Sequence, residues 1–157
     1  MKTLAVVAMA ALTAISAKAA EPIKIKGFYI GMGKDAATKT IRGGLSIKTD
    51  TDTKPYDSAV FGEYTPTGFY QARLYFKEDT LRSFTLTQGY FDAAHFPQED
   101  FVRAIVDNYR LKASCRTVFN QVAVLLCTAV GPDGERIDVG GGEVEVTGAS
   151  AGKPSFD

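Results

Sequence analysis

The chain has 157 residues, of which 45% are hydrophobic and 23% are charged, and its formal net charge is zero. These values are ordinary for a globular domain, and the length suits one domain with its own hydrophobic core. A neutral chain lacks the positive charge that binding to nucleic acid or to an anionic membrane surface requires.

The first nineteen residues have the pattern of a bacterial secretory signal peptide. Lys2 gives a positive start, residues 4–15 are apolar or small, and Ala17 and Ala19 occupy the positions that a signal peptidase reads. We therefore expect cleavage after Ala19, which leaves residues 20–157 as a periplasmic or secreted protein. The apolar run is shorter than the ~20 residues of a membrane span. No cysteine stands directly after the cleavage site. We therefore expect neither a stable membrane anchor, because the apolar run is too short, nor a lipid anchor, because the cysteine that would carry it is missing.

Cys115 and Cys127 are the only two cysteines. In an oxidising compartment, a pair this close in sequence predicts a disulfide. Closing a loop of this size stabilises the folded chain by about 3 kcal/mol in the chain-entropy description. The spacing is not C-x-x-C, which argues against a redox pair or a metal pair.

The first half of the exported chain predicts short elements separated by glycines and prolines. Apolar residues alternate with lysines over residues 23–30, which is typical of a strand. A short helix is expected over residues 35–42, with Asp35 in its first turn and a pair of glycines after its end. Residues 45–51 read as a polar strand, and residues 52–68 as a loop.

The middle of the chain carries the strongest structural signal. Residues 69–77 and 81–87 alternate between apolar and polar side chains, with a turn at 78–80 between them, which predicts an antiparallel hairpin with one buried face. A helix over residues 98–110 follows Pro97. Its apolar stripe, which we expect to face the sheet, consists of Phe101, Val102, Ile105, Val106 and Tyr109.

The last third is predicted to be β. Residues 118–130 read as one central strand, residues 131–134 as a turn and residues 136–139 as a short strand. Val144 and Val146 alternate with glutamates, as in an edge strand. Residues 148–157 are small and polar, and we expect a disordered tail there.

These elements predict an α+β fold, in which an antiparallel sheet of about five to six strands carries two helices mainly on one face. Residues 20–147 form a single domain in this interpretation, between the signal peptide and the tail.

No motif for catalysis, cofactor binding or metal binding emerges. Gly31–Lys34 lacks the first glycine and the Ser or Thr of a phosphate-binding loop. His95 is the only histidine, and it stands just before the predicted helix without a nucleophile motif. Asp50–Asp52 begins like a calcium loop, but the later ligand positions do not match. We therefore assign no catalytic, cofactor-binding or metal-binding residues.

A group of aromatic residues falls on the hairpin face opposite the predicted core positions or at the hairpin ends. Such a group is either a recognition surface or a second core layer that another element covers. The residues are Tyr64, Phe69, Tyr75, Tyr90 and Phe91.

One stretch of the sequence resembles small exported α+β modules. Ile30-Gly31-Met32 leads into Asp35-Ala36-Ala37 and Ile41, and three predicted strands follow from Leu45 to Leu86. This order is similar to outer-membrane assembly lipoproteins of the BamE type and to β-lactamase inhibitor proteins, over about half of the exported chain. The lipid-bearing cysteine of the lipoproteins is absent here. The resemblance implies a non-catalytic module that binds other proteins.

The sequence thus favours an exported protein-interaction module whose partner is an unknown protein in the cell envelope or outside the cell. The alternative is a binder of a small ligand or lipid, which would use space between helix 98–110 and the sheet. An enzyme ranks third, because no cluster of acid, base and nucleophile emerges.

Overall fold

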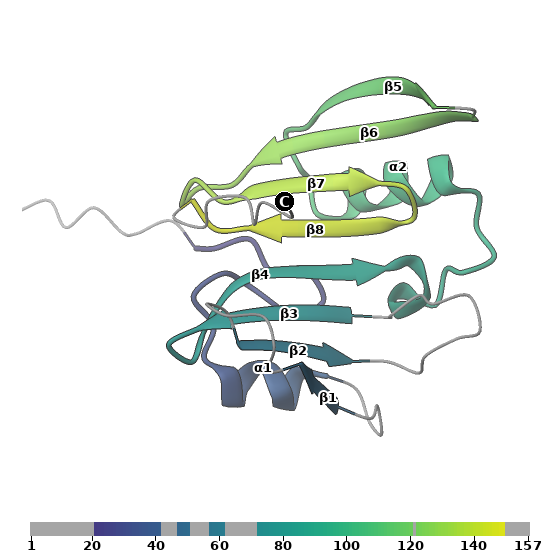
Figure 1. Cartoon of the computed structure of the whole chain (residues 1–157). Helices are drawn as coiled ribbons and strands as arrows, with labels where there is room; N and C mark the ends of the chain where they lie inside the picture. The colour runs from purple at the N-terminus through teal and green to yellow at the C-terminus, as the bar shows by residue number, and fades with distance from the viewer. Residues whose placement is uncertain (1–20, 42–46, 51–56, 62–71, 121, 150–157) are drawn as a thin grey trace, which may run out of the picture.

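The computed structural model describes residues 21–41, 47–50, 57–61, 72–120 and 122–149. Figure 1 shows the arrangement of these residues as one sheet with helices packed on it. The elements in chain order are α1 (Lys34–Thr40), β1 (Ile47–Asp50), β2 (Asp57–Phe61), β3 (Ala72–Lys77), β4 (Thr80–Thr87), the 3₁₀ helix η1 (Gln88–Phe91), α2 (Gln98–Asn108), β5 (Ser114–Asn120), β6 (Val122–Val130), β7 (Arg136–Gly140) and β8 (Glu143–Thr147).

The eight strands of the described residues form a single sheet in the order β1-β2-β3-β4-β8-β7-β6-β5, and every neighbouring pair is antiparallel. Two four-stranded meanders therefore meet where β4 pairs with β8. The predicted α+β class with an antiparallel sheet is confirmed. The sheet is wider than the predicted five to six strands, because β2 lies in the segment read as a loop and residues 114–130 form two strands.

One face of the sheet carries the core. Strand alternation places Leu74, Phe84 and Val146 on this face, and all three are almost fully buried. The helix α2 packs on the same face against β6 and β7. The predicted stripe is confirmed, because Phe101 and Ile105 are buried and the other three stripe residues are buried or partly buried against the same core.

The segment predicted as a strand over residues 23–30 is a tight turn instead. Ile25 and Phe28 exchange backbone hydrogen bonds of 2.9 Å in both directions. Between them, Lys26 and Gly27 have φ angles of 51° and 89°. Glycine adopts this left-handed conformation readily, which ends the extended pattern after Ile25. The turn brings the Phe28 ring to 5.8 Å from the Phe84 ring in the core.

Two predictions about the last third are wrong. Residues 118–130 are not one central strand, because β5 and β6 form an antiparallel pair at the end of the sheet. The strand that contains Val144 and Val146 is not an edge strand, because β8 lies between β4 and β7. Both of these valines are buried.

The ordered domain extends past residue 147. The backbone N–H of Gly148 donates a 2.9 Å hydrogen bond to the carbonyl of Arg82, and Gly148 is buried. The predicted signal peptide and residues 150–157 of the predicted tail lie outside the described residues.

The disulfide between Cys115 and Cys127 is confirmed. The two residues are direct neighbours in the β5–β6 register, with Cα atoms 4.0 Å apart and sulfurs 2.07 Å apart. Such a bond is consistent with an oxidising compartment. None of the helices in the described ranges is both long and apolar enough to cross a membrane.

Candidate interaction surface

The face of the sheet opposite α2 is polar over β3, β4, β8 and β7 and mostly apolar along β6, and we call it the open face. It consists of the residues that alternate with the core positions on β3, β4, β8, β7 and β6. The side chains that define it here are Arg73, Tyr75, Thr85, Thr128, Arg136, Asp138, Glu143 and Glu145.

A continuous row of polar residues crosses the middle of this face. The strand registers place Arg73 opposite Thr85, Thr85 opposite Glu145, Glu145 opposite Asp138, and Asp138 opposite Thr128. Directly opposed side chains on one face lie close enough to interact across each strand pair. The row therefore connects both meanders through their contact at β4 and β8.

Asp138 accepts hydrogen bonds from Thr128 on the neighbouring strand β6 and from Arg136 on its own strand β7. The Thr128 hydroxyl donates a hydrogen bond of 2.6 Å to Asp138 Oδ1. The Arg136 guanidinium donates bonds of 2.6 Å to Oδ2 and 3.0 Å to Oδ1. The hydrogen bond and the charge of Asp138 raise the pKa of Arg136 above its usual value. Bidentate pairing of this kind fixes both side chains, so the two charged groups have defined positions on this face.

The centre of the open face is negative. Glu143 and Glu145 both project from β8 and are exposed. Desolvation next to the sheet raises the pKa of Glu143, and the charge of Glu145 raises it further, while Arg73 acts in the opposite direction. The two carboxylates thus lie between the arginine of β3 and the Arg136–Asp138 pair of β7.

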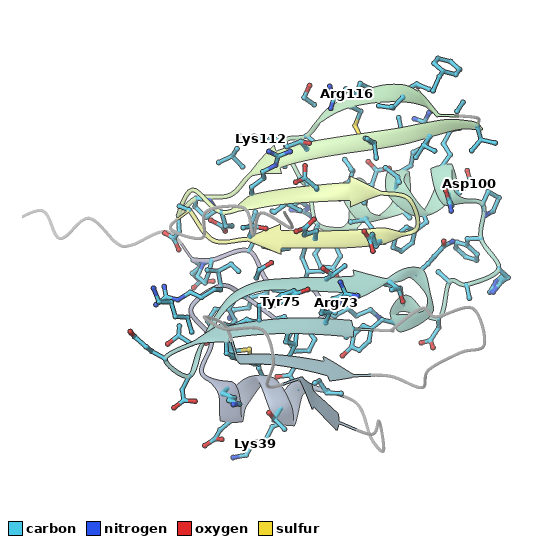
Figure 2. The ribbon with its side chains drawn as sticks, in the orientation of Figure 1. Lys39, Arg73, Tyr75, Asp100, Lys112 and Arg116 are labelled. Carbon is cyan, nitrogen blue, oxygen red and sulfur yellow. A yellow bond between two sulfur atoms is a disulfide. The ribbon has the colours of Figure 1, made fainter. Side chains whose placement is uncertain are left out.

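Tyr75 supplies an aromatic ring next to this charged region. Figure 2 shows Arg73 and Tyr75 side by side on β3. The Arg73 Nη1 donates a 3.4 Å hydrogen bond to the Tyr75 hydroxyl, and both residues are half-buried. Of the predicted aromatic group, Tyr75 is the member that the structure places on the open face. Tyr64 and Phe69 lie outside the described residues.

Tyr90 and Phe91 do not belong to this surface, which corrects the sequence prediction. Both lie in η1 on the helix side of the sheet and pack against the core. The Tyr90 ring is 6.0 Å from Phe28, and the Phe91 ring is 5.4 Å from Phe101. The reason is that β4 ends at Thr87, so the two-residue alternation used to assign their side no longer applies beyond it.

The polar residues of β7 and β8 are the part of the surface that sequence reasoning missed. Their signal is present, because Arg136 and Asp138 alternate with buried residues and so do Glu143 and Glu145. On β8 the alternation predicts an edge strand, whereas the strand lies in the middle of the sheet. Its central position depends on the pairing with β4, which is distant in sequence.

The described residues contain no group of three or more His, Cys, Asp or Glu side chains that could hold a metal ion. His95 is exposed, and its ring packs edge-on against Phe96 at 4.8 Å. No family model, no curated protein and no solved structure matches the chain.

Proposed function

We propose that the chain is an exported, non-catalytic module that binds another protein through the open face of its sheet. The observation that supports this proposal is the contrast between the two faces. Helix α2 and the N-terminal segment cover one of them, whereas the other carries a polar row and a half-exposed tyrosine.

The composition of the open face suits a protein partner. Tyrosine and arginine are enriched in protein interfaces, because both combine a large contact area with directional hydrogen bonds. Here Tyr75 and Arg73 on β3 share the face with an ion pair on β7 that is already ordered, Arg136 with Asp138. A partner would meet these groups with little loss of side-chain freedom, which favours affinity.

The alternative of a small-ligand or lipid binder receives less support. It needs space between α2 and the sheet, and the side chains of α2 occupy that region. Phe101, Val102 and Ile105 are 2%, 1% and 3% exposed and belong to one core cluster with the residues of β6 and β7.

Site-specific photo-crosslinking in the native cell tests the interaction proposal. A benzophenone amino acid replaces Tyr75 in one variant and Phe96 in a matched control, since Phe96 is an aromatic residue that is 47% exposed in the segment before α2. We expect a discrete covalent adduct from position 75 and none from position 96. Equal adducts from both positions, or none from position 75, would contradict the proposed surface.

A second variant separates binding from folding. Tyr75→Ser removes the ring from the open face, and we expect the adduct formed by a crosslinker at the neighbouring Arg73 position to disappear. The free energy of unfolding should stay within about 1 kcal/mol of the wild type, because surface substitutions are usually mild. An unfolded Tyr75→Ser variant would mean that Tyr75 belongs to a second core layer.

Export has its own test. N-terminal sequencing of the protein from the periplasm or culture medium should begin at Ala20. Exported protein that still begins at Met1 would contradict the predicted cleavage after Ala19.

A further inference from the structure

The outermost strand β5 leaves one edge of the described sheet unprotected. Among the described strands its only neighbour is β6, and the β5–β6 register runs without a bulge from Ser114 to Asn120. The strand contains no proline, and Arg116 is its single charged residue. Proline, bulges and several charges are the usual devices that keep an edge strand from pairing with another chain.

The geometry of the disulfide shows which backbone groups point outward. In an antiparallel pair, residues whose Cα atoms lie about 4.5 Å apart do not exchange hydrogen bonds, whereas those about 5.5 Å apart do. The Cys115–Cys127 separation of 4.0 Å identifies the first kind. The backbone N–H and C=O groups of Cys115 therefore point away from β6. By the alternation of the ladder, the same holds for Thr117 and Phe119.

The side chains of these three residues are also exposed. Phe119 is 82% exposed, and Cys115 and Thr117 are also exposed. They lie on the helix side of the sheet, but α2 packs on β6 and β7. Among the described residues, nothing pairs with these outward backbone groups, and the aromatic ring of Phe119 is exposed.

We propose that β5 pairs antiparallel with β5 of a second copy of this chain, about a two-fold axis at Thr117. In this register, Thr117 lies opposite Thr117 of the second copy, and Cys115 lies opposite Phe119. All outward N–H and C=O groups of these three residues then find partners, because each of them falls in a hydrogen-bonding pair of the new ladder. Two copies related in this way share one self-complementary interface, as in most homodimers.

The side chains of β5 favour a second copy in this register. On the helix side, the exposed Phe119 ring packs beside the exposed Cys115 and its disulfide. On the open face, Arg116 lies opposite Val118, so the two guanidinium groups are not opposed. A two-residue shift that centres the axis on Arg116 would place like charges directly opposite, which is destabilising. A shift to Val118 would leave Cys115 without a partner in β5.

The pairing would join two sheets into one and make their open faces continuous across the axis. Arg116 of each copy lies near this junction, and Figure 2 shows it on the outer strand, far from Tyr75 on β3. The assembly would present two copies of the proposed binding surface on one side. The pairing itself does not depend on that binding.

Sedimentation equilibrium of the exported chain tests the proposal. We expect wild-type protein to have twice the monomer mass at micromolar concentration. Thr117→Pro removes an outward N–H that β6 does not use, so the variant should become monomeric and keep the denaturation midpoint that wild type shows when it is diluted to the monomer. The loss of two backbone hydrogen bonds at the axis should weaken self-association by about 100-fold. The control Thr117→Ser keeps the N–H and should remain dimeric.

A second pair of variants checks the register. Thr117→Cys places two thiols opposite each other at a distance that a disulfide can bridge, so oxidation should give a covalent dimer. Val118→Cys should not, because Val118 faces Arg116 of the second copy. A wild type that is monomeric over the whole concentration range would overturn the proposal. So would a folded Thr117→Pro variant that dimerises as tightly as wild type, or a covalent dimer formed by Val118→Cys alone.

Discussion

The two faces of the sheet come from the same strands, yet their side chains lie in different surroundings. On β4, Phe84 is fully buried against Phe28, whereas the next residue, Thr85, is half-buried in the polar row of the open face. The same change occurs at each step along β3, β7 and β8. Because strand alternation separates the two sets of side chains, substitutions on one face should change stability and substitutions on the other should change binding.

The largest expected difference between the faces is at Phe84 and Thr85. Phe84→Ala should lower the free energy of unfolding by about 3–5 kcal/mol, because it removes a fully buried ring and leaves a cavity. Thr85→Ala should lower it by no more than about 1 kcal/mol. Chemical denaturation of both variants measures the difference. Equal losses would mean that the open face is packed as tightly as the core.

Two glutamates, one buried and one on the open face, give a second comparison with a smaller expected difference in the free energy of unfolding. Glu135 is 3% exposed, and its carboxylate accepts hydrogen bonds from the backbone N–H groups of Asp133, at 2.9 Å, and Ile23, at 3.4 Å. Glu135→Ala should destabilise the fold by about 1.5–3 kcal/mol, the usual effect of losing hydrogen bonds to a charged group.

The matched control is Glu145→Ala on the open face, which should change the free energy of unfolding by less than about 0.5 kcal/mol. Denaturation midpoints of the two variants under the same conditions give the comparison. If Glu145→Ala were the more harmful of the two, the open face would be part of the structural core.

The sequence predicted well those elements whose signal is local. In the hairpin of β3 and β4, β3 alternates strictly and β4 alternates on either side of one irregularity, where the register shifts, and α2 has a clear apolar stripe after Pro97. The disulfide was predicted from its compartment and spacing alone, and the register later placed its cysteines opposite each other. In each case, neighbouring residues carry enough information to decide the structure.

Elements that depend on distant contacts were predicted less well. The alternation on β8 indicates a strand with one buried face, but the position of β8 between β4 and β7 is a long-range pairing. The placement of Tyr90 and Phe91 failed for a related reason, since η1 turns toward the helix side after β4. For the open face, alternation shows which residues share a side, and the order of the strands decides which of them meet.

The smallest expected effect concerns Glu143 on the open face. Desolvation and the charge of Glu145 raise its pKa in the folded state above the unfolded value of about 4.3. The folded state therefore binds the proton more tightly, so this group lowers stability as the pH rises from the unfolded pKa through the folded pKa. At neutral pH the ionised Glu143 carboxylate therefore lowers the free energy of unfolding. Below about pH 4 this effect is absent, because the carboxyl group is protonated in both states.

Glu143→Gln should therefore stabilise the fold at pH 7 by less than about 1 kcal/mol, since solvent screens an exposed carboxylate, and should have no effect near pH 3.5. Urea denaturation at the two pH values measures this change.

High salt distinguishes the two causes of the raised pKa, because it screens the repulsion from Glu145 but leaves the desolvation. Since desolvation is the larger cause, most of the gain should persist at 1 M salt. A gain that vanishes in salt would identify the Glu143–Glu145 repulsion as dominant, and a gain that is the same at both pH values would show that ionisation of Glu143 is not its source.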